Sequence, residues 1–168
     1  MPKFDTRSIA ALGVLLAAEI VLTRFVSFTT WNTRIGFGFV PVVLAALLFG
    51  PVHAALVAGM GDFVGAILFP VGPYFPGFTL TAVLTGLVFG FFLGRANRLL
   101  GTLAAVAVVQ FVLGLFLNTF WIHLLYSSPF LPLLATRLVQ AVVLSVVQVV
   151  TIQALYPLAD RLKGSAVL

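Results

Sequence analysis

The sequence predicts an all-α integral membrane protein: a compact bundle of six transmembrane helices joined by short loops, with N- and C-termini cytoplasmic. The composition predicts this class, because 62% of the residues are hydrophobic and 8% are charged, with a mean hydropathy of +1.22. Such a chain cannot cover its surface with polar groups, as a water-soluble protein does. The 168 residues are enough for about six spans of ~20 residues each, so we expect residues 1–168 to form a single multi-pass domain in the cell membrane.

Six apolar runs define the expected spans, at residues 9–26, 35–49, 52–69, 78–93, 100–126 and 133–156. The segments between them carry turn chemistry, such as Gly50-Pro51 and Ser127-Ser128-Pro129. The second run is short and the Gly50-Pro51 turn is tight, so runs two and three are expected to form a helical hairpin that only just crosses the bilayer. The first run lacks a cleavage site and is interpreted as a retained helix.

The basic residues predict the orientation of the bundle. An even number of spans places both termini on one side, and that side should carry most of the Lys and Arg residues of the short loops. Six basic residues fall on the terminal side and three on the other: Lys3, Arg7, Arg95, Arg98, Arg161 and Lys163 against Arg24, Arg34 and Arg137. The termini are therefore expected in the cytoplasm, although snorkelling to the headgroups also explains the three outer arginines.

The segment from Phe69 to Thr79 reads FPVGPYFPGFT and separates the third and fourth spans. It holds three prolines, two glycines and the adjacent rings of Tyr74 and Phe75, whereas flexible loops in water are usually polar. We interpret it as a fixed lid or pocket wall at the outer membrane surface.

Polar residues within the spans predict a polar interior, since a charge at mid-membrane costs about 3 kcal/mol on insertion scales. Two stripes recur at helical spacing: Gln110, Gly114, Asn118 and Trp121, then Arg137, Gln140, Leu144 and Gln148. The glutamines are interpreted first as hydrogen bonds between helices. Asp62 has two interpretations: it is a structural partner of an Arg or of a backbone amide, or it contacts the ligand. Arg137 is favoured as functional. Glu19 is expected to point inward.

The first span also carries a strip of small residues at Ala10, Gly13 and Ala17. Glu19 lies two residues past Ala17, about 200° round the helix at about 100° per residue, so an inward Glu19 places the strip outside the bundle. Small strips allow close helix approach. A partner protein is one interpretation, and lipid exposure or internal alanine packing is the other.

Several classes of function find no support in the sequence. It contains no G-x-S-x-G, H-E-x-x-H or P-loop motif and no cysteine, so we expect neither an enzyme nor a chain that hydrolyses ATP itself, and no bound cofactor or metal. The net charge of +5 is spread along the chain instead of clustering on one element, which argues against nucleic acid.

Four segments make the chain resemble the substrate-binding S components of energy-coupling factor (ECF) vitamin transporters, in particular the folate-specific branch: RIGFGFVPVVLAALLFGP (34–51), GDFVGAILFPVGPYFPGFTLTA (61–82), LGLFLNTFWI (113–122) and ATRLVQ (135–140). The resemblance implies six helices and a vitamin site open to the outside. It also implies that Gly13 and Ala17 dock onto a transmembrane coupling subunit that carries two ATPases. Ala135 stands where family members have Pro, which affects the expected start of the sixth helix.

Folate consists of a pterin, a benzoyl linker and a glutamate tail with two carboxylates, and the chain offers groups for each part. Arg24, Arg34 and Arg137 can donate to its carboxylates, while Asn118 and Asp62 offer polar groups to the pterin. Ring faces are offered by Trp31, Tyr74, Phe75 and Trp121. The alternatives are an S component for another vitamin or an autonomous secondary transporter, which normally contains internal repeats and paired broken helices.

Overall fold

The computed structural model describes residues 6–29, 34–95 and 97–164. Its elements follow the chain in this order: α1 (Thr6–Arg24), β1 (Phe28–Thr29), β2 (Arg34–Ile35), α2 (Phe39–Phe49), α3 (Pro51–Leu68), α4 (Pro76–Leu93), α5 (Arg98–Ala107), the π-helix η1 (Val108–Leu117), α6 (Asn118–Tyr126) and α7 (Phe130–Gly164). Since α5, η1 and α6 are continuous, the described residues form six helical segments, one for each predicted run.

Five of these segments, within the described part of the chain, are long and apolar enough to cross a membrane. The exception is α2, whose 11 residues extend about 16 Å at 1.5 Å per residue, against a hydrocarbon core of about 30 Å. The second predicted run therefore begins too early. Residues 34–35 instead form β2, which pairs antiparallel with β1 through Phe28 opposite Ile35. The described part of the chain has no strands other than these two, each of two residues.

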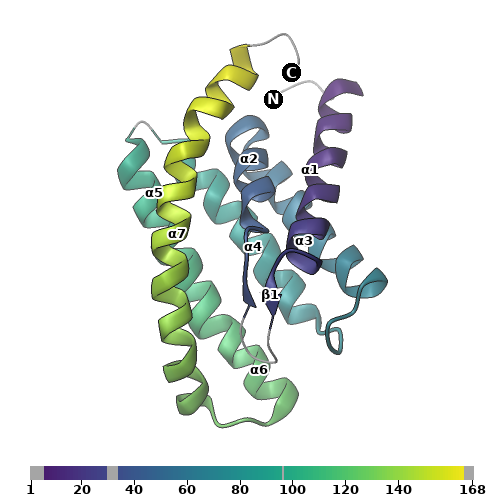
Figure 1. Ribbon diagram of the computed structural model, residues 1–168, viewed down its shortest axis with the longest axis vertical. Helices are drawn as coiled ribbons and strands as arrows, with labels where there is room; N and C mark the ends of the chain where they lie inside the picture. The colour runs from purple at the N-terminus through teal and green to yellow at the C-terminus, as the bar shows by residue number, and fades with distance from the viewer. Residues whose placement is uncertain (1–5, 30–33, 96, 165–168) are drawn as a thin grey trace.

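The start of α1 and the end of α7 lie at one end of the molecule, which we call the terminal end (Figure 1). The turn between α6 and α7 lies at the opposite end. The expected turn at Gly50-Pro51 is confirmed, because Gly50 ends α2 and Pro51 begins α3. The aromatic segment is shorter than expected. Its last four residues already belong to α4, which begins at Pro76, where a proline ring fits the first helical turn.

The apolar core lies nearer to the terminal end than the polar residues do. It joins the end of α2, the start of α3, the end of α4, α5 with η1, and the end of α7, with Val43, Phe89 and Ile152 fully buried. The tightest contact is between α3 and α4, where Gly86 faces the backbone of Ala54 and Ala55 and Gly90 faces Pro51, so a side chain at either glycine would strike a helix backbone. This packing closes one half of the bundle and leaves space between the helices in the other.

Candidate ligand-binding cavity

A cavity of about 510 Å³ lies between the helices, within the range of 300–1,000 Å³ that is typical of small-molecule sites. Residues from α1, α2, α3, α4, η1, α6 and α7 line it, together with residues 71–75 of the aromatic loop. Six of the nine residues predicted to bind substrate are among them: Arg24, Asp62, Tyr74, Phe75, Asn118 and Arg137.

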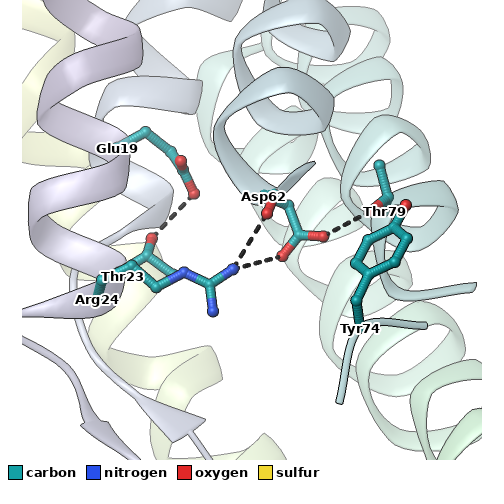
Figure 2. A network of polar contacts seen from close by, with 6 residues as sticks. All are labelled: Glu19, Thr23, Arg24, Asp62, Tyr74 and Thr79. Atoms are coloured by element: carbon teal, nitrogen blue, oxygen red, sulfur yellow. Dashed lines mark hydrogen bonds and ion pairs between the residues drawn. The ribbon is translucent and has the colours of Figure 1, made fainter. Parts of the chain in front are cut away.

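One network of polar contacts crosses the cavity wall from α1 to α4 (Figure 2). Arg24 Nη2 lies 3.4 Å from Asp62 Oδ1 and donates to the backbone carbonyl of Asp62 at 3.1 Å. The other carboxylate oxygen of Asp62 accepts from Thr79 Oγ1 at 2.8 Å, and Thr79 lies 3.4 Å from the Tyr74 hydroxyl. Asp62 is therefore a partner of Arg24, within a wall that α1, α3 and α4 share, and its ligand contact stays a prediction.

Two glycines of α3 make room for the polar side chains of α1. A Cβ at Gly65 would lie 2.8 Å from Arg24 Nε, and a Cβ at Gly61 would strike the carboxylate of Glu19. Glu19 is buried and lines the cavity, and its Oε1 accepts from Thr23 Oγ1 at 2.9 Å. The inward orientation of Glu19 is confirmed, and the one-turn spacing of the two glycines explains how α1 can approach α3 with these large groups between them.

Arg137 enters the cavity from α7 and is 8% exposed. Its Nη2 donates to the carbonyl oxygen of Gly114 in η1 at 3.0 Å. The π-helix is a rare, wide helix that occurs often at functional sites. The guanidinium has five N–H donors in a planar fork, so the bond to Gly114 fixes its position and does not exhaust its capacity to donate.

Two of the glutamines, Gln110 and Gln148, differ from the first interpretation. Gln110 and Gln148 are 7% and 4% exposed and line the cavity, and neither makes a hydrogen bond to another described residue. They therefore do not join helices to each other. Gln140 also lines the cavity, as does Asn118, whose Oδ1 is buried without a hydrogen-bond partner in the described part of the chain. Apart from Trp121, the residues of the two stripes therefore line the cavity.

The aromatic residues form one layered side of the site. Phe75 lines the cavity, and its ring centre lies 5.6 Å from that of Trp121. Trp121 donates from Nε1 to Thr81 Oγ1 at 3.1 Å and lies outside the lining, behind Phe75. Tyr74 lines the cavity and meets Phe63 edge to face at 5.8 Å.

The side chains of two other predicted site residues are not described, and all nine ligand contacts stay predictions. Trp31 lies outside the described residues, and Arg34 belongs to β2 but its side chain is not described. The expected docking strip lies on the outside, since Ala10, Gly13 and Ala17 are exposed and no atom lies within 4 Å of a Cβ built on Gly13.

Sequence reasoning missed several lining residues that carry hydroxyl groups: Thr23, Thr81, Thr85 and Tyr126. For two of them, the spacing in the sequence indicated a position in the cavity wall. Thr23 follows Glu19 by four residues on the same helix face. Tyr126 continues the steps of four from Gln110 through Gly114, Asn118 and Ile122, all of which line the cavity.

Apolar side chains are exposed along all the long helices, and the polar groups gather around one cavity. The fold and the site therefore define a multi-pass membrane protein that binds a small molecule. The chain matches the family described as ECF-type riboflavin transporter, S component, over residues 3–162, and it belongs to that family.

Three relatives give the comparison more detail. The folate transporter FolT of Clostridium novyi (strain NT) is 35% identical over 153 residues, which cover 90% of this chain and 89% of the relative. FolT of Leuconostoc mesenteroides subsp. mesenteroides is 29% identical over 155 residues, which cover 88% of this chain and 83% of the relative. A crystal structure of FolT bound with folic acid has 33% sequence identity and a TM-score of 0.84, and the match covers 94% of this chain and 95% of that one.

Proposed function

We propose that this chain is the folate-binding S component of an ECF-type transporter, which captures folate outside the cell and delivers it through an ATP-driven module. The family description names riboflavin, while the relatives are folate transporters. The observation that favours folate is the pair of guanidinium groups of Arg24 and Arg137 in the cavity wall. Folate carries two carboxylates on its glutamate tail and riboflavin carries none, so Arg137, together with the N–H groups of Arg24 that do not contact Asp62, fits folate.

Calorimetry on the purified protein in detergent tests the ligand. We expect folate to bind with a Kd of roughly 1 nM, or about 12 kcal/mol, because the cavity offers ring faces, amides and cationic donors together. Riboflavin, biotin and thiamine should give no heat at the same concentrations. If one of those vitamins binds and folate does not, the proposed ligand is wrong although the family assignment stands.

The energy for transport comes, in this proposal, from a transmembrane coupling subunit and two ATPases. The support on this chain is the exposed strip of Ala10, Gly13 and Ala17, which leaves a smooth face for a partner helix in the bilayer. Uptake by proteoliposomes that contain this chain alone should be absent, and addition of the complete module with ATP should restore it. Uptake without the module would instead favour an autonomous transporter.

A further inference from the structure

Basic residues outnumber acidic ones at the terminal end of the bundle. Among the described residues, this end carries one carboxylate, that of Asp160, and several exposed basic side chains: Arg7, Arg95, Arg98, Arg161 and Lys163. The positive-inside rule accounts for their number, but it requires only charge and no fixed geometry. Where α4 ends and α5 begins, the structure adds such a geometry.

Arg95 and Arg98 are held close together by the crossing of α4 and α5. Gly101 lies against the carbonyl oxygen of Phe92, and a Cβ built on Gly101 would lie 3.9 Å from the Cβ of Arg95. The Cζ of Arg95 lies 4.6 Å from the ring centre of Phe92, and the Cζ of Arg98 lies 4.9 Å from that of Tyr156. A guanidinium stacked on a ring keeps the N–H groups at its edge available to an acceptor.

The position of Arg98 is fixed further by α7. Its Nη1 and Nη2 donate to the two carboxylate oxygens of Asp160 at 2.9 and 3.3 Å. The ring beneath it is buried, and the hydroxyl of Tyr156 lies 3.4 Å from both Leu93 O and Thr102 Oγ1. A guanidinium has five N–H donors, so the two bonds to Asp160 leave others for a second anion.

The remaining cations have no such counter-charge. The side chain of Arg95 makes no ion pair or hydrogen bond with another described residue. Lys163 follows Asp160 by three residues and Tyr156 by seven, so it lies on the face of α7 that meets α5. Arg161 lies about 200° round the helix from Lys163, at about 100° per residue. The face shared by α4, α5 and α7 therefore carries three cations against one carboxylate.

An apolar surface adjoins this basic cluster. Phe91 lies one turn before Arg95 on α4, while Leu99, Leu100 and Leu103 occupy neighbouring positions one turn apart on α5. All four side chains are exposed. The cluster thus lies at the end of an apolar strip, which suits a molecule with an anionic head and hydrocarbon chains.

The location of the cluster distinguishes a lipid from a protein partner. In Figure 1, α5 lies on the far side of α7 from α1. α1 packs on α2 and α3, whereas α5 packs on α4 and α7. The cluster is therefore turned away from the strip of Ala10, Gly13 and Ala17, which is the face proposed for the coupling subunit, and it meets the bilayer.

We propose that Arg95, Arg98 and Lys163 bind the phosphate of an anionic phospholipid in the leaflet at the terminal end, with the acyl chains along Leu99, Leu100 and Leu103. Guanidinium groups form charge-assisted hydrogen bonds with phosphate oxygens, and clusters of Lys and Arg beside a spanning helix attract anionic headgroups. This inference goes beyond the proposed function and does not depend on which vitamin is bound.

Native mass spectrometry of the full chain in detergent, with phosphatidylglycerol and phosphatidylcholine of the same acyl chains, tests the site. Phosphatidylcholine carries a choline cation that cancels its phosphate charge, so the wild type should bind phosphatidylglycerol at least about fivefold more tightly. Arg95→Gln and Lys163→Gln should each weaken phosphatidylglycerol binding about fivefold, as expected for one basic residue near an anionic headgroup. The matched control, Arg161→Gln, should change it by less than about twofold, because its charge lies on another face of α7.

Folate calorimetry on each variant provides the control for folding, because none of these residues lines the cavity. Equal binding of the two lipids by the wild type, or an equal loss in Arg161→Gln and Lys163→Gln, would overturn the site. Displacement of phosphatidylglycerol by an equal concentration of soluble glycerol phosphate would show a free-phosphate site and overturn the lipid assignment. The same assignment fails if Arg95→Gln retains lipid affinity and loses co-purification with the coupling subunit, since the cluster would then bind protein. Each of these outcomes leaves the folate proposal standing.

Discussion

The ion pair between Arg24 and Asp62 should behave as a buried, coupled unit. The two groups are 3.4 Å apart, and their side chains are 6% and 17% exposed. At an effective dielectric constant of about 20, Coulomb attraction at this distance is about 5 kcal/mol, and desolvation of both groups opposes most of it. Arg24→Met or Asp62→Asn alone leaves one buried group without its counter-charge, so we expect each to lower the free energy of unfolding by about 2–3 kcal/mol.

The double variant is the informative member of this cycle. With both charges removed, no buried charge is left without its counter-charge. The loss of unfolding free energy in the double variant should therefore be smaller than the sum of the two single losses by about 1.5 kcal/mol or more. Denaturant unfolding in mixed micelles, followed by circular dichroism without ligand, measures all four proteins. If the two single effects add within about 0.5 kcal/mol, the two residues do not interact and the structural argument for Asp62 is refuted.

Three further predictions concern the ligand, the partner and the orientation. Arg137→Ala should weaken folate binding by about 2 kcal/mol or more and Arg137→Lys should recover only part of it, because an ammonium lacks the planar fork; a well-folded Ala variant with wild-type affinity would make Arg137 structural only. The double variant Gly13→Trp with Ala17→Trp should keep folate binding near normal. It should abolish co-purification with the coupling subunit and ATP-dependent uptake, because bulky side chains on this face hold a partner helix away. Full uptake by this variant would refute docking at this strip. Since the chain has no cysteine, single cysteines at the exposed positions Val71 and Arg161 can report the orientation in the membrane. A membrane-impermeant maleimide on intact cells should label Val71→Cys and not Arg161→Cys. The reverse result would invert the predicted orientation.

The helices were predictable because apolar runs and turn residues are local signals. The second helix was the exception, since an apolar run from residue 35 continues across β2 into α2 without a change in composition. Apolar character records contact with lipid or core, and it does not distinguish a short strand from the first turn of a helix.

The polar stripe of the fifth segment shows a different limit. A step of three from Asn118 to Trp121 fits an α-helix, and on that basis Trp121 was placed with the site. Gln110, Gly114 and Asn118 line the cavity at the predicted steps of four, but Ile122 and Tyr126 of α6 continue that row in place of Trp121. The contact of Arg137 with Gly114 of the π-helix joins residues 23 positions apart, so it leaves no trace in local spacing.

Glu19 was predictable in orientation but not in its contacts. A carboxylate in a spanning helix must face protein or trapped water, so its inward placement followed from the sequence. Its contact with α3 depends on Gly61, and a glycine in an apolar run is equally consistent with many other helix contacts. The glutamines were assigned to helix contacts for a similar reason, because nothing in the sequence indicates whether the space opposite them is filled.

The two faces of α1 are the reason that we expect mutation to separate ligand binding from docking. Its inner face carries Glu19, Thr23 and Arg24, which the cavity and α3 hold in place. Its outer face carries Gly13 and Ala17, which contact the surroundings of the bundle. Because the bilayer cannot solvate polar groups, the inner face has to stay turned inward, so the outer face is presented at a fixed rotation. A bulky residue on that outer face therefore changes what can approach the helix without turning Glu19 or Arg24 out of the cavity.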